Sequence, residues 1–133
     1  MSDLELLTNF LSQEYNIDIL FDKDEEDAYY HDVKCIGICT RHSKEVQLFC
    51  LLHEAGHFLI RRRRNFPIKY RDTDSNKKTS KTVDVIREEI NAWEEGERLA
   101  KKLRITLDEG RWTSYWKKQV YEYILWGAET KKV

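Results

Sequence analysis

The sequence has few of the features that mark membrane, secreted or nucleic-acid-binding proteins. Its formal net charge is −1, so no excess charge draws it toward nucleic acid or an anionic membrane. No apolar run approaches the roughly 20 residues of a membrane span, and no basic stretch near the first residue indicates a signal peptide. The three cysteines lack the spacing of a disulfide framework. We therefore expect one soluble domain over residues 1–133, with no membrane partner, in a reducing cytoplasm.

The single proline, Pro67, lies in a segment that differs from the rest of the chain. In residues 61–81 basic side chains greatly outnumber acidic ones and the helical pattern is lost, so we expect a loop. This segment begins with four arginines, Arg61, Arg62, Arg63 and Arg64. They either form a solvated helix end, where cations suit the helix dipole, or contact a substrate. Nucleic-acid contact through this loop is a further alternative, which the overall charge does not favour.

Residues 53–57 carry the strongest chemical signal, His-Glu-Ala-Gly-His, inside an apolar helical run. On a helix, His53 and His57 lie at i and i+4 and project from one face. Two neutral imidazoles at that spacing can hold one Zn²⁺, and Glu54 then lies beside the ion as a base for water. The flanking apolar residues make two unpartnered histidines costly. The pattern therefore favours a zinc centre over a buried helix with two hydrogen-bonded core histidines.

No histidine follows this motif, which excludes the metzincin pattern and directs the search for a third ligand to the acids of the next helix. Residues 82–104 repeat apolar residues at helical spacing. Glu89 lies at the middle of that apolar arc and Glu88 at its border. Because a buried carboxylate needs a cationic partner, we prefer Glu89 as the ligand, with Glu88 as the alternative.

Other polar residues are candidates for supporting roles. A histidine ligand is usually oriented by a hydrogen bond to its other nitrogen, and Asp84 or Asn91 could supply it. A second donor to the oxyanion is usually needed, and Tyr70, Arg71 or His42 could supply that. Cys50 lies one turn before His53, so it is an alternative fourth zinc ligand, although buried cysteine usually behaves as a small apolar residue.

The remaining pattern predicts an α+β fold. We expect a helix over residues 3–13, strands within 17–21 and 29–40, and the motif helix over 44–63 with Ser43 as its N-cap. The acidic residues 22–27 fit a solvated turn. A C-terminal helix carries aromatic residues from Trp112 onward, which we interpret as core. The sheet is expected to be small and mostly antiparallel.

The order of these motifs resembles a known family. A strand followed by His-Glu-Ala-Gly-His at 53–57, and then Glu-Ile-Asn-Ala at 89–92, is similar to the ImmA/IrrE group of small metallopeptidases, which commonly show H-E-x-x-H followed by E-x-x-A. The resemblance covers about residues 30–105. It implies a minimal zincin fold, with one helix bearing the motif and a later helix bearing the glutamate.

The resemblance also implies an activity. Zinc ligands would be His53, His57 and Glu89, and the catalytic carboxylate would be Glu54. Members of the group often cleave a regulatory protein, often a repressor, in bacteria or mobile elements, so we expect a zinc endopeptidase with a protein substrate. The alternative is a zinc-stabilised or inactive binding module, such as an inhibitor or antirepressor of a mobile element.

Overall fold

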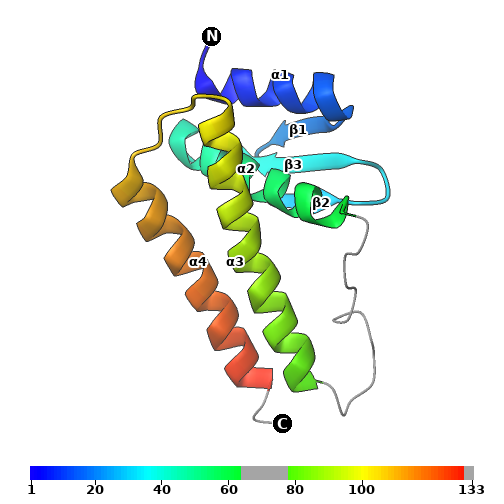
Figure 1. The fold of residues 1–133 in the computed structure, drawn as a ribbon, viewed down its shortest axis with the longest axis vertical. Coiled ribbons are helices and arrows are strands. Elements are labelled where there is room, and N and C mark those ends of the chain that lie inside the picture. The colour runs from blue at the N-terminus through cyan, green and yellow to red at the C-terminus, as the bar shows by residue number, and fades with distance from the viewer. Residues whose placement is uncertain (64–77, 131–133) are drawn as a thin grey trace.

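The structure is a computed structural model that describes residues 1–63 and 78–130. Within these ranges the chain forms four helices and three strands, and it is an α+β fold as predicted (Figure 1). The elements are α1 (Asp3–Tyr15), β1 (Asp18–Asp22), β2 (Ala28–Tyr30), β3 (Cys35–Cys39), α2 (Lys44–Arg61), α3 (Lys78–Lys102) and α4 (Glu109–Thr130). None of the described helices is apolar over the length that crossing a bilayer would require.

The three strands form a mixed sheet in the order β1-β3-β2. β1 pairs with β3 in parallel from Asp18 opposite Cys35 to Asp22 opposite Cys39, whereas β2 pairs with β3 antiparallel. The expectation of a mostly antiparallel sheet is therefore wrong. β3 is the central strand. It pairs with β2 in the antiparallel direction and with β1 in the parallel direction.

Helix α2 is buried on most of its circumference. Its N-terminus is capped as predicted, because the Ser43 hydroxyl accepts a hydrogen bond from the backbone N–H of Val46 at 3.2 Å. Leu51 and Leu52 have no exposed surface, and neither do Ile36 and Ile38 of the sheet. Burial of these four side chains holds α2 in a core position between the sheet and the long helices (Figure 1).

Helices α2 and α3 pack with their backbones in contact. A Cβ atom added at Gly56 would lie 2.0 Å from the carbonyl oxygen of Ala92, and one added at Gly96 would lie 2.7 Å from that of Leu52. Only glycine fits such an approach. The close packing predicted from Ala92 and Gly96 is thus confirmed. It sets a short distance between the α2 face with the two histidines and the α3 face with the two glutamates.

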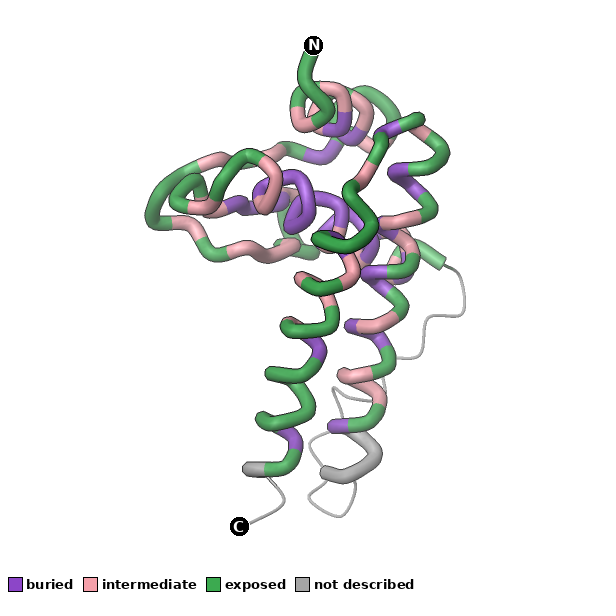
Figure 2. The backbone as a smooth tube through the Cα atoms, turned by 90° about the vertical axis from the view of Figure 1, so that its left-hand side faces the viewer, coloured by how far each residue is buried: buried purple, intermediate pink, exposed green. Residues whose placement is uncertain are grey.

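Helices α3 and α4 lie side by side and extend beyond the sheet (Figure 2). Near the sheet, Trp112 of α4 packs edge-on against Trp93 and Phe49, each with ring centroids 5.3 Å apart, and its indole N–H donates to Glu97 at 3.0 Å. Farther along α4, the buried residues become sparse and large apolar side chains are exposed. Among the described residues this part of α4 packs on α3, where Gly127 faces Thr82 and Ile86.

Candidate metal centre

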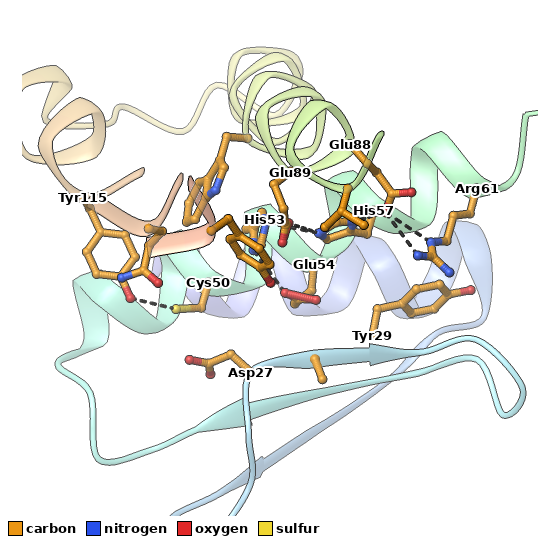
Figure 3. A pocket seen from close by; sticks show the side chains of 15 residues that line it. Asp27, Tyr29, Cys50, His53, Glu54, His57, Arg61, Glu88, Glu89 and Tyr115 are labelled. Carbon is orange, nitrogen blue, oxygen red and sulfur yellow. Dashed lines mark hydrogen bonds and ion pairs between the residues drawn. The ribbon is translucent and has the colours of Figure 1, made fainter. Parts of the chain in front are cut away.

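Three side chains from α2 and α3 converge on one point (Figure 3). The Oε2 atom of Glu89 lies 3.1 Å from Nε2 of His53 and 2.7 Å from Nε2 of His57, and the two Nε2 atoms are 3.2 Å apart. A tetrahedral zinc ion with bonds of about 2.0–2.1 Å keeps its ligands roughly 3.3 Å apart. The three atoms therefore already lie close to the spacing that zinc requires.

The other nitrogen of each histidine is occupied by a carboxylate. Nδ1 of His57 lies 2.6 Å from Oε2 of Glu88, and Nδ1 of His53 lies 3.1 Å from Oε2 of Glu54. A carboxylate accepts hydrogen bonds, so each Nδ1 carries a proton, and a ring that is neutral then turns a lone pair at Nε2 toward Glu89. In that form two lone pairs and a carboxylate face one another and need a cation, and the residues fit zinc in this respect.

Protons and a metal ion compete for this cluster. Burial lowers the pKa of His57, but hydrogen bonds with Glu88 and Glu89 outweigh it and raise that pKa to about 10. Burial likewise opposes protonation of His53, whose pKa is nevertheless raised by Glu54 and Glu89. Burial raises the pKa of Glu89, yet the two histidines hold it well below its usual range. Metal binding therefore has to displace protons from the imidazoles.

The centre opens into a pocket of about 390 Å³ between β2, α2, α3 and α4. The ring of Trp93 stacks on that of His53, with centroids 4.1 Å apart and planes within 10°. The Glu89 side chain is 6% exposed and that of His53 is 13% exposed, so the ligand atoms are shielded from bulk water. Such shielding strengthens electrostatic interactions inside the pocket.

Glu88, predicted only as an alternative ligand, lies behind His57 instead. Its Oε2 atom also accepts from Arg61, with Nη2 at 3.2 Å, so it links the end of α2 to the histidine. The other predicted substrate-contact arginines point elsewhere or are outside the described residues. The Arg62 guanidinium lies 4.8 Å from the Tyr15 ring centroid, and Arg63 pairs with Glu95. Arg64, Tyr70 and Arg71 lie outside the described residues.

Three predicted supporting residues are not brought to the centre. Neither Asp84 nor Asn91 lines the pocket, and Asn91 is exposed. Positions two or five residues from Glu89 project from other sides of a helix, which explains their placement. The His42 ring lies 3.0 Å from Oδ2 of Asp27 and also does not line the pocket.

The sequence interpretation missed the tyrosines of α4. Trp112 is in the core as expected, but Tyr115 and Tyr123 line the pocket. Burial and the neighbouring carboxylates, Glu89 above all, raise the pKa of Tyr123. The spacing of polar side chains could have indicated this. Tyr115, Gln119 and Tyr123 are four residues apart, so their polar groups lie on one face of the helix.

Comparison of the chain with protein-family models, curated proteins and solved structures finds no match. Its class is therefore argued from its own residues. They form an α+β fold in which two histidines on one helix and a glutamate on the next meet in a shielded pocket.

Proposed function

We propose that this protein is a zinc-dependent endopeptidase with a minimal zincin fold. The observation that carries the proposal is the convergence of the Nε2 atoms of His53 and His57 on the Glu89 carboxylate, with both Nδ1 atoms already engaged. The resemblance to ImmA/IrrE peptidases supports the same assignment. By that resemblance the substrate is a regulatory protein, such as a repressor, in the cytoplasm.

Glu54 is the proposed general base. When bound by His53, His57 and Glu89, zinc lowers the pKa of a water ligand toward about 7 and polarises a carbonyl oxygen. Glu54, next to His53 and lining the pocket, takes the proton of the attacking water and then donates it to the leaving amine nitrogen. Tyr123, which lines the same pocket, supplies the second hydrogen bond to the oxyanion.

The position of β2 supports a peptide as substrate. β2 is at the edge of the sheet among the described residues, and Ala28 and Tyr29 line the pocket beside the zinc ligands. An edge strand offers backbone donors and acceptors that an extended peptide can pair with. A substrate chain paired with β2 would pass the ligand cluster, which accounts for cleavage of a main-chain bond rather than of a small molecule.

The test compares Glu54→Gln with Glu45→Gln, the same change at a half-buried position of the same helix that does not line the pocket. Zinc-loaded proteins are incubated with unfolded casein and with a proteome-derived peptide library, and fragments are quantified by mass spectrometry. We expect Glu54→Gln to cut about 10²–10⁴ times more slowly while retaining zinc, and Glu45→Gln to match the parent. Equal rates for Glu54→Gln and the parent would refute the assignment. A parent that cuts nothing but holds a partner would favour the binding-module alternative.

A further inference from the structure

A second group of metal-ligand side chains lies beside the pocket and has no part in the proposed reaction. Asp27 precedes β2, His42 follows β3 and Cys50 belongs to α2. One ligand atom from each lies within 4.8 Å of the others, although the three residues come from separate segments of the chain. Within the group, Oδ2 of Asp27 is 3.0 Å from Nε2 of His42.

Backbone contacts hold two members of this group in place. The other carboxylate oxygen of Asp27, Oδ1, accepts the backbone N–H of Cys39 at 2.9 Å. The backbone carbonyl of His42 accepts a hydrogen bond from Nε2 of Gln47 at 2.8 Å. Outer hydrogen bonds of this kind orient the ligands of natural metal sites. The Asp27 carboxylate and the backbone that carries His42 are therefore held in place, and Oδ2 of Asp27 and Nε2 of His42 already face each other.

The thiol of Cys50 lies at the edge of the core, where it meets a polar group. The residue is 4% exposed, and its Sγ atom lies 3.5 Å from the Tyr115 hydroxyl and within 4.8 Å of a carboxylate oxygen of Asp27. A buried cysteine that served only as a small apolar group would contact apolar side chains. Burial and the Asp27 carboxylate raise the pKa of the Cys50 thiol, and the Tyr115 hydroxyl, which can donate to a thiolate, offsets this only in part. A metal ion bound here would therefore have to displace the thiol proton.

We propose that Asp27, His42 and Cys50 bind a second zinc ion. Carboxylate, imidazole and thiolate are all zinc ligands, and three protein ligands leave a fourth position for solvent. On binding, the thiol loses its proton to solvent, and the carboxylate and thiolate then balance the two charges of the ion. Asp27 and Cys50 also line the pocket of the first centre, which gives the ion an entry path.

The second site shares no ligand with the first, and its ion would hold the edge strand in place rather than take part in the proposed reaction. Cys50 lies three residues before His53, so the two groups occupy successive turns of α2. An ion bound there would tie the start of β2 and the end of β3 to the middle of α2. It would fix the edge strand that forms one wall of the pocket.

The test counts zinc ions and detects a thiolate ligand. Full-length protein is loaded with zinc, dialysed against metal-free buffer and analysed by plasma mass spectrometry. We expect two ions per chain in the parent and in Cys35→Ser, the matched control, because Cys35 belongs to neither ligand group among the described residues. Cys50→Ser and His42→Asn should each lose one ion. Glu89→Ala should lose the other, whichever outcome the peptidase assay gives.

Cobalt substitution provides the second measurement, which remains informative if a variant retains zinc weakly. The parent and Glu89→Ala should show thiolate-to-cobalt charge-transfer absorption, and Cys50→Ser should not. Far-UV circular dichroism of the variants, with Asp27→Asn as a milder change, checks that they fold. One ion per chain that Cys50→Ser does not affect would overturn the second site and leave the first intact. A single ion that carries the thiolate band and is lost in Glu89→Ala would also overturn it, since Cys50 would then belong to the first centre.

Discussion

Two regions of the molecule depart from the usual distribution of side chains. The seam, which is the contact between α2 and α3 around Gly56 and Ala92, buries carboxylates. The C-terminal part of α4 exposes apolar side chains. In the seam, Glu88 and Glu89 are only 7% and 4% exposed, whereas Ile124 and Leu125 of α4 are 47% and 45% exposed. Buried carboxylates need compensating partners, and exposed apolar residues add little stability. The comparison teaches that the seam is built around charge, while the outer helix end contributes little to the core.

The largest effect is expected where the two backbones touch. Gly56→Ala would place a Cβ atom 2.0 Å from the Ala92 carbonyl, so the helices must separate. We expect the free energy of unfolding to fall by about 3 kcal/mol, measured by urea denaturation. Gly110→Ala is the control, because its added Cβ would lie 3.5 Å from the Asp108 carboxylate, an ordinary contact, and a gain of about 0.5 kcal/mol is expected there. Equal midpoints for the two variants would contradict the tight seam.

The two neighbouring glutamates of the seam should differ in their effect on zinc. Glu89→Gln removes a ligand and should weaken zinc binding by more than about 100-fold, whereas Glu88→Gln, behind His57, should cost about 10–100-fold. Glu94→Gln, exposed on the same helix, should have no effect. Competition with a chromophoric chelator measures all three affinities. If Glu88→Gln weakened binding more than Glu89→Gln, the ligand assignment would have to be exchanged.

The pH dependence of stability should differ between the metal-free and the zinc-bound protein. In the metal-free protein His57 has a pKa of about 10, above an unfolded value near 6.5, so its contribution is complete below pH ~6.5 and is lost as the pH rises toward 10. The lowered pKa of Glu89 gives a contribution that is present above pH ~4.3 and lost on acidification. Zinc needs neutral imidazoles, so the stabilisation that zinc adds should grow with pH.

Thermal melting between pH 5.5 and 9, with and without zinc, checks this prediction. The metal-free protein should lose several degrees of melting temperature across the range, and the gap between the two forms should widen. A metal-free protein that became more stable toward pH 9 would show that the histidines are not held by the carboxylates.

The smallest effect is expected at the outer end of α4. Leu125→Ser replaces a side chain that is 45% exposed, and the free energy of unfolding should change by less than about 0.5 kcal/mol. The same substitution at Leu51, which is fully buried, is the matched contrast and should destabilise the protein severely. A loss above about 1 kcal/mol for Leu125→Ser in urea denaturation would show that this face contributes to folding after all.

Features that depend on neighbours in the sequence were predictable. The Ser43 cap, the motif helix and the burial of Glu89 at the middle of its apolar arc follow from spacing alone, and the structure confirms each of them. The ends of helices were predicted less accurately than their existence, since α2 ends at Arg61 and the predicted end was residue 63.

Features that depend on packing between distant segments were not predictable. Which strand of the β2–β3 pair lies beside β1 is decided by tertiary contacts, so the parallel pairing was missed. The face of α4 that meets the pocket depends on how α4 packs on α3, so Tyr115 and Tyr123 were interpreted as core. Glu88 reaches His57 because the helix axes are so close, a distance that only the folded protein reveals.

The contact between Gly56 and the Ala92 carbonyl has a consequence for how this scaffold can diversify. Because main-chain atoms fix the separation of the two ligand-bearing helices, side chains on the outer walls can change without moving the ligands. Tyr29 of β2 and Gln119 of α4 are such wall positions. New substrate preferences can therefore be selected at these walls while the coordination geometry is inherited unchanged.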